Sequence, residues 1–145
     1  MSRIGVFFAE GYEEIEALTV VDLARRAGIE VCMISVEEKE EVEGSHGITV
    51  RMDGKLSETD FSGLDMLVLP GGKKGTEGLE SCGALMEQLD RFYEAGKPVA
   101  AICAAPSIFG HRGYLKGKRA TSYPSFEEHL EGAQVTHAPA ETDAN

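Results

Sequence analysis

The chain has 145 residues, 42% of them hydrophobic and 27% charged, which is enough for one globular domain with a single buried core. The formal net charge of -11 argues against nucleic-acid binding and against docking on anionic membranes, because both require clustered Lys and Arg. Acidic residues interrupt any signal-peptide core near the start, and no apolar run approaches the ~20 residues of a membrane span, so we expect a cytoplasmic protein.

Short apolar runs alternate with amphipathic segments along the chain, which predicts an α/β fold with a mostly parallel sheet. Strands are expected over 4–8, 29–36, 48–52, 66–69, 99–103, 118–123 and 134–137. Helices are expected over 13–26 and from about 76 to 95, with a loop or exposed hairpin over 37–47 and a polar connector over 56–61. The continuous apolar runs are typical of strands that are covered on both faces. No repeat or linker divides the chain, so residues 1–145 are interpreted as a single domain.

The three cysteines, Cys32, Cys82 and Cys103, are far apart and form no Cys-x-x-Cys pair. This spacing fits neither a disulfide framework nor a zinc site and suits a reducing compartment. We therefore expect no metal and no cofactor. Cys32 is predicted to lie in a strand of the core, and Cys82 is predicted to be a surface or semi-buried thiol.

Cys103 has a different setting, because it ends a predicted strand and starts a predicted helix. Ligands of open parallel sheets bind beyond the carboxyl ends of the strands, where the strand before Gly71 and Gly72 also ends. A helix N-terminus would lower the pKa of the Cys103 thiol towards the range of about 3.5–7.5. The backbone N–H groups of Gly71, Gly72 and Ala104 could then form an oxyanion hole.

A simpler interpretation of the same pattern is that Cys103 is a small buried residue and that Gly71-Gly72 is only a tight turn. The pattern alone leaves both interpretations open. Glu10, Glu13 and Glu14 are predicted to form a solvated or capping face of the first helix. Glu16, by its periodicity, could also be a surface residue.

Three segments, 67-LVLPGG-72, 100-AAICAAP-106 and 10-EGYEEIEAL-18, resemble the signatures of the ThiJ/PfpI superfamily and of its DJ-1-like branch. The similarity continues through 25–28 and 116-KGKRATSYPSFE-127. It implies a flavodoxin-like layered fold, with helices on both faces of the sheet and Cys103 on a nucleophile elbow. It also implies a hydrogen bond between Glu16 and the sulfur. Two adjacent anions repel, so a protonated Glu16 that donates to the thiolate would satisfy both groups.

The chain departs from the family pattern at two positions near the cysteine. Protease-like branches place a histidine directly after it, where this chain has Ala104, and this tells against a protease. DJ-1-like members often carry a histidine where this chain has Tyr123, so a Cys–His general base is not expected. The histidines elsewhere are interpreted as exposed or structural, at positions 111, 129 and 137.

The resemblance also implies a homodimer, and His46 matches a position near the dimer contact of relatives. Relatives continue past the segment 137–145 with one more strand and a C-terminal helix. We therefore expect this chain to be truncated and to lack both elements.

Two functions of different classes follow from the resemblance. The leading hypothesis is a cysteine-dependent enzyme of the glyoxalase III or deglycase type, acting on 2-oxoaldehydes or their adducts through Cys103 and Glu16. The alternative is a non-catalytic sensor of oxidative stress, or a chaperone, that uses an oxidisable cysteine. A role in thiazole monophosphate biosynthesis is less favoured, because the chain has neither a phosphate-binding glycine loop nor a lysine cluster.

Overall fold

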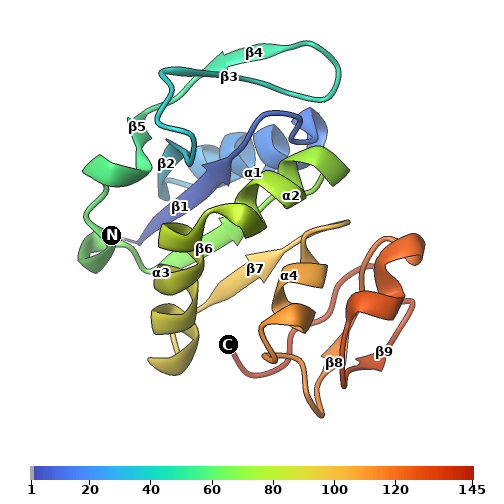
Figure 1. Cartoon of the computed structure of the whole chain (residues 1–145). Helices are drawn as coiled ribbons and strands as arrows, with labels where there is room; N and C mark the ends of the chain where they lie inside the picture. The colour runs from blue at the N-terminus through green and yellow to red at the C-terminus, as the bar shows by residue number, and fades with distance from the viewer. Residues whose placement is uncertain (1) are drawn as a thin grey trace.

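The computed structural model describes residues 2–145, and its centre is a five-stranded parallel sheet (Figure 1). The strands lie in the order β5-β2-β1-β6-β7. Their bounds are Arg3–Phe8 for β1, Glu30–Ser35 for β2, Gly54–Lys55 for β5, Met66–Leu69 for β6 and Val99–Ala101 for β7. The run β2-β1-β6-β7 follows the first four positions of the flavodoxin-like strand order 2-1-3-4-5, which confirms the predicted fold class.

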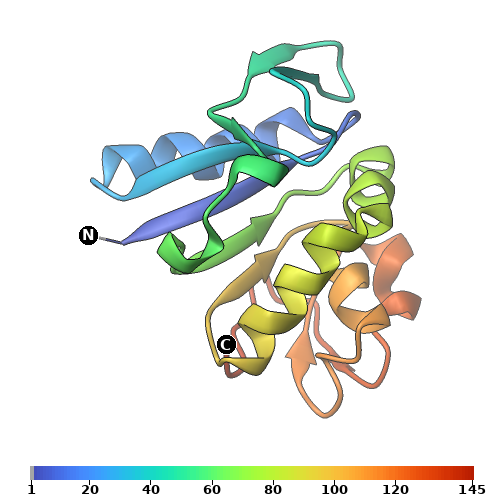
Figure 2. The ribbon, with the colours of Figure 1, turned by 60° about the vertical axis from the view of Figure 1, so that its left-hand side comes forward.

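Helices cover both faces of this sheet (Figure 2). The α-helices are α1 (Glu14–Arg26), α2 (Lys73–Ser81), α3 (Gly83–Glu94) and α4 (Pro106–His111), and the 3₁₀ turns are η1 (Leu56–Glu58), η2 (Phe61–Gly63) and η3 (Pro124–His129). Alternate residues of β1 supply the two cores. Phe7 joins the cluster under α2, α3 and α4, whereas Val6 and Phe8 join the cluster under α1.

A two-stranded antiparallel hairpin stands apart from the main sheet. It consists of β3 (Glu41–Glu43) and β4 (Thr49–Arg51), and its loop lies near the start of α1 (Figure 1). The hairpin agrees with the strand predicted over 48–52 and with the exposed hairpin allowed over 37–47. Val42 is fully buried in the core beneath α1, so the hairpin is anchored there.

The single helix predicted from about 76 to 95 is wrong, because the structure has two helices there. The helix is interrupted at Cys82, where ψ is 93°, and α2 already begins at Lys73. Gly83 follows the break directly, and glycine weakens a helix at such a position. Apolar periodicity carries through the break, which is why the sequence pattern did not reveal it.

The last part of the chain forms a small parallel pair of strands beside α4. These are β8 (Arg119–Ala120) and β9 (Gln134–Val135), both shorter than the strands predicted over 118–123 and 134–137. The final residue, Asn145, lies next to β7 and accepts a hydrogen bond from the Val99 N–H at 2.9 Å. The free edge of the main sheet is thus partly paired by the end of the chain.

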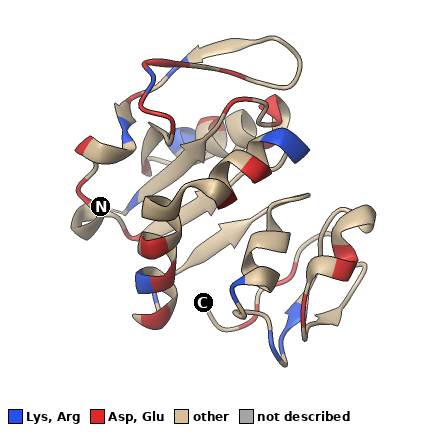
Figure 3. Ribbon diagram, viewed as in Figure 1, with Lys and Arg blue, Asp and Glu red and all other residues tan. Residues whose placement is uncertain are grey.

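Acidic residues are spread over several helices and connecting segments, with Lys and Arg placed among them (Figure 3). Over residues 2–145, none of the helices is both long and apolar enough to cross a membrane.

Candidate active site

Cys103 sits on a sharp turn between β7 and α4. Its φ is +63°, a left-handed conformation that costs a residue with a side chain about 1–2 kcal/mol. Hydrogen bonds on both sides hold the turn: the Ile102 N–H donates to the Leu69 carbonyl at 3.2 Å, and the Tyr123 N–H donates to the Cys103 carbonyl at 2.8 Å. The turn is therefore the strand-to-helix elbow that the resemblance implied, with the strain that such an elbow carries.

Glu16, in the first turn of α1, reaches this elbow. Its carboxyl group hydrogen-bonds to the Cys103 thiol and accepts the Gly71 N–H at 2.9 Å. In return, the Glu13 N–H donates to the Gly71 carbonyl at 3.0 Å. The start of α1 and the turn after β6 are thus joined by two hydrogen bonds, which place Glu16 beside the sulfur.

Gly71 and Gly72 leave no room for side chains at this junction. A Cβ on Gly71 would lie 2.3 Å from Glu16 Oε2 and 2.8 Å from the Cβ of Cys103. Gly72 has a φ of +90°, and a Cβ there would lie 2.7 Å from the Glu13 nitrogen. Both glycines are therefore required for the contact between α1 and the elbow.

The backbone donors divide between the two acidic groups. The N–H groups of Gly72 and Ala104 hydrogen-bond to the Cys103 sulfur, whereas the Gly71 N–H is occupied by the Glu16 carboxylate. Two of the three predicted oxyanion donors, Gly72 and Ala104, therefore point to the sulfur, and the third, Gly71, binds the Glu16 carboxylate.

The electrostatics of the pair favour retention of a proton. Burial raises the pKa of Glu16 above its ordinary value, against the hydrogen bonds from Cys103 and Gly71. The pKa of the Cys103 thiol is raised to about 11, mainly by burial. The hydrogen bond with Glu16 and the charge of Glu16 raise it further. The last proton thus leaves the pair only in strong alkali. Two adjacent anions are thus disfavoured, and the arrangement with the negative charge on sulfur and the proton on Glu16 stays a prediction.

The direction of the thiol pKa differs from the prediction made from the helix N-terminus. α4 begins at Pro106, three residues beyond Cys103, and has only six residues. Burial and the neighbouring carboxylate outweigh the N–H groups of Ala104 and Gly72. Thiolate character at Cys103 therefore depends on Glu16 holding the proton.

The remaining thiols have other surroundings. Cys32, on β2, accepts a hydrogen bond from the Arg3 guanidinium at 3.3 Å, and Cys82 lies 4.0 Å from the Val36 carbonyl. Both are half-buried, and all three cysteines are free thiols. Cys32 is thus less enclosed than predicted.

The histidines pair with surface acids. His111 hydrogen-bonds to Glu80 through Nδ1, and its Nε2 lies 3.0 Å from His129 Nδ1. His137 Nδ1 lies 3.1 Å from Glu127 Oε1. Tyr123 contacts the elbow through its backbone, while its ring is more than half exposed.

The hairpin loop contacts the start of α1, which sequence reasoning did not foresee. One ligand atom from each of Glu13, Glu14 and His46 lies within 4.8 Å of the others. These atoms already hydrogen-bond or ion-pair with one another, so we assign no ion to them. No short-range pattern links this loop to α1, since the partners are about 30 residues apart.

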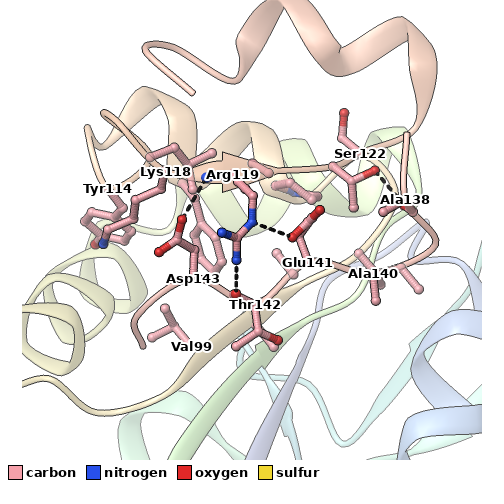
Figure 4. Close-up of a pocket in the computed structure, with 18 of the residues that line it drawn as sticks. Val99, Tyr114, Lys118, Arg119, Ser122, Ala138, Ala140, Glu141, Thr142 and Asp143 are labelled. Carbon is pink, nitrogen blue, oxygen red and sulfur yellow. Dashed lines mark hydrogen bonds and ion pairs between the residues drawn. The ribbon is translucent and has the colours of Figure 1, made fainter. Parts of the chain in front are cut away.

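A cavity of about 730 Å³ lies on the other side of the elbow. Ile102, Cys103 and Pro106 form part of its wall, and the segment 137–145 forms much of the rest. Figure 4 shows Arg119 reaching from β8 to Glu141 and to the carbonyl of Thr142 within this wall. Glu16 and the two glycines do not line the cavity, so it is separate from the Glu16 side of the sulfur.

Together, the parallel sheet with helices on both faces and the elbow cysteine define an α/β protein with a cysteine–carboxyl pair at the carboxyl edge of its sheet. Residues 2–145 match the model of the DJ-1/PfpI family, and the chain belongs to that family.

Curated relatives and solved structures agree with this assignment. The chain is 42% identical to "Protein DJ-1 homolog B" of Arabidopsis thaliana over 123 residues, which are 84% of this chain and 28% of that protein. It thus spans less than a third of that relative. It is 32% identical over 139 residues to a deglycase of Pyrococcus abyssi, covering 96% of this chain and 82% of that one. A structure of oxidised Toxoplasma gondii DJ-1 superimposes with a TM-score of 0.92 at 33% identity, covering 99% of this chain and 79% of the other.

Proposed function

We propose that the protein is a cysteine-dependent enzyme of the deglycase or glyoxalase III type, acting on 2-oxoaldehydes or on their adducts with amines. The observation that carries the proposal is the hydrogen bond between Glu16 and the Cys103 thiol, on an elbow where Gly72 and Ala104 present N–H groups. The Pyrococcus abyssi relative, which is named a deglycase, supports the substrate class.

In this mechanism the Cys103 sulfur adds to the aldehyde carbon and forms a C–S bond. The aldehyde oxygen takes the negative charge, which the N–H groups near the sulfur stabilise, and Glu16 then protonates it to give a hemithioacetal. An amine adduct of the same aldehyde enters by displacement: the C–S bond forms, the C–N bond breaks, and Glu16 supplies the proton that the departing amine takes up.

The ionised Glu16 next removes the hydrogen from the sulfur-bound carbon and returns it as a proton to the neighbouring carbonyl carbon, while the hydroxyl proton of the hemithioacetal passes to the neighbouring oxygen. The first carbon is oxidised and the second reduced, so the step needs no external oxidant, and the product is a thioester of a 2-hydroxy acid. Water cleaves the C–S bond of the thioester, which releases the acid and restores the protonated pair.

The test is lactate formation from methylglyoxal, together with recovery of free amine from a methylglyoxal-treated amino acid. Cys103→Ser should abolish both, because a neutral hydroxyl group is a far weaker nucleophile than a thiolate. Cys82→Ser is the matched control and should keep both. Turnover that survives Cys103→Ser would exclude the proposed nucleophile.

A sensor function remains the second candidate, because one observation favours it. Cys103 is free, and its sulfur contacts are Glu16 and two backbone N–H groups rather than a second thiol. Oxidation of such a thiol would proceed to a sulfinate held by the same donors. Peroxide addition of two oxygens to the Cys103 peptide, with no lactate from the parent protein, would favour the sensor over the enzyme.

We also propose that the protein assembles as a homodimer through α1 and the hairpin. Two large apolar side chains support this proposal: Ile15, on the first turn of α1, is 75% exposed, and Ile48, beside β4, is 51% exposed. Exposed apolar groups on neighbouring elements are typical of a surface that another chain covers.

A further inference from the structure

The loop of the β3–β4 hairpin is hydrogen-bonded to the first turn of α1. The His46 N–H donates to Glu14 Oε1 at 2.7 Å, and His46 Nδ1 lies 2.8 Å from Glu14 Oε2. The Ser45 N–H donates to the Tyr12 carbonyl at 2.8 Å, and the Ser45 hydroxyl lies 3.3 Å from Glu13 Oε2. Backbone and side-chain bonds thus join the loop to three successive residues.

The central group of this contact is a buried carboxylate. The Glu14 side chain is only 6% exposed, whereas the ring of His46 is 65% exposed. A Cβ on Gly44 would lie 2.1 Å from Glu14 Oε1, so the loop backbone packs directly on the carboxylate. An ionised carboxylate this enclosed requires such partners, and His46 supplies two of them.

The first turn of α1 has little internal support of its own. Its N-cap, Glu13, makes no side-chain capping hydrogen bond, although capping usually stabilises the orphan N–H groups at a helix start. Glu16, which meets Cys103, lies in the same turn as Glu14. The hairpin loop therefore contacts the same helical turn that carries Glu16.

We propose that Ser45 and His46 form a positioning clamp, which fixes the first turn of α1 and thereby keeps Glu16 against Cys103. The inference rests on the role proposed for the Glu16–Cys103 pair and adds residues that do not touch the sulfur. The clamp is electrostatic as well as steric, because His46 Nδ1 also lies 3.4 Å from Glu13 Oε1.

The charges of the clamp give it a pH dependence. The groups that face His46 are Glu13 and Glu14 of α1 and the hydroxyl of Ser45. The hydrogen bond to Glu14, with the charges of Glu13 and Glu14, raises the pKa of His46 above 6.5. The charged clamp is therefore complete below pH 6.5 and weakens as the pH rises through that raised pKa.

The test compares alkylation of Cys103 by iodoacetamide, read by peptide mass mapping, in the parent, His46→Ala and Glu16→Ala proteins. Loss of Glu16 removes a hydrogen bond and a charge that raise the pKa of the Cys103 thiol and should therefore speed alkylation at pH 6.5. His46→Ala should speed it in the same direction by about threefold, since the turn that keeps Glu16 against the thiol loses one charge-assisted contact. His46→Arg should restore the rate, because a guanidinium group can still bind the carboxylate. Arg26→Ala, which removes an exposed ion pair from the other end of α1, should leave it unchanged.

Two further results separate a clamp from a general loss of stability. In the Glu16→Ala background, His46→Ala should have no additional effect, because the clamp acts through Glu16. The difference between His46→Ala and the parent should also shrink towards pH 9. A rate unchanged by His46→Ala, a fully additive double mutant or a pH-independent difference would each overturn the proposal. Alkylation needs no aldehyde turnover, so these outcomes are independent of whether the enzyme proposal holds.

Discussion

Gly71 donates its backbone N–H to the Glu16 carboxylate and leaves no space for a side chain between Glu16 and Cys103. One residue thus both holds the carboxyl group and allows it to approach the sulfur. The glycine is required by this close approach between α1 and the β6–α2 turn.

Gly71→Ala should therefore displace Glu16 and lower the rate of lactate formation at least about tenfold, since a shift of about 1 Å in a reacting group can cost far more. Overpacking of the junction should also destabilise the fold by roughly 1–3 kcal/mol in chemical denaturation. Gly54→Ala is the matched control, because a Cβ there meets no atom within 4 Å. Equal effects of the two substitutions would contradict the structural role of Gly71.

Glu16→Gln should show a pH-dependent gain in stability. The folded-state pKa of Glu16 is raised by burial, so ionisation above pH 4.5 costs the folded protein free energy that the unfolded chain does not lose. The melting temperature of Glu16→Gln relative to the parent should thus increase as the pH rises from 4 to 7. Turnover should fall sharply, because the amide cannot exchange a proton. A constant difference in melting temperature would show that Glu16 is not buried as an acid.

Asp90, on α3, provides the opposite pH dependence. Arg112 Nε donates to the Asp90 carboxylate at 2.7 Å, and this contact lowers the pKa of Asp90 below 3.8. Burial opposes the shift, and the hydrogen bond from the Tyr114 hydroxyl adds to it. Its contribution is present above pH 3.8 and is lost as the pH falls through the lowered pKa.

Asp90→Asn should destabilise the protein at pH 7 by roughly 1 kcal/mol, a value kept small because the side chain is about one-third exposed. The difference should shrink in urea titrations as the pH falls below 3.8. Asp22→Asn, which weakens the exposed pair with Arg26, serves as the control and should change stability by at most roughly 0.5 kcal/mol. A deficit that stays constant as the pH falls would indicate that packing rather than charge is responsible.

Ile15→Asp should convert the proposed dimer to a monomer in light scattering. A carboxylate at a 75% exposed position costs the isolated chain little, whereas burial against another subunit would leave it without a partner. Leu23→Asp, at another exposed apolar position of α1, shows how far along the helix the contact extends. A parent protein that is already monomeric would exclude the dimer.

Much of the fold could be predicted because the strands of a doubly covered sheet are continuous apolar runs. The runs at 4–8 and 66–69 lie within a residue of β1 and β6. The break at Cys82 could not be predicted, since the inner stripe of α3 continues the pattern of α2.

The site was predictable only in part, for a related reason. The positions of Cys103 and Gly72 follow from where their strands end, but Glu16 was selected by the family resemblance alone. The raised thiol pKa depends on burial by distant segments, and the contact of His46 with Glu14 joins residues 32 positions apart. Such long-range contacts leave no local signal in the sequence.

The left-handed backbone at Cys103 implies a trade-off between reactivity and thermal resistance. Glycine adopts this conformation without the steric penalty of a Cβ, although it costs more entropy on folding, by roughly 0.5–1 kcal/mol. Cys103→Gly should therefore melt at a higher temperature than Cys103→Ala, which keeps the strained Cβ. The residue proposed as the nucleophile would then also lower the stability of the fold relative to a glycine at the same position.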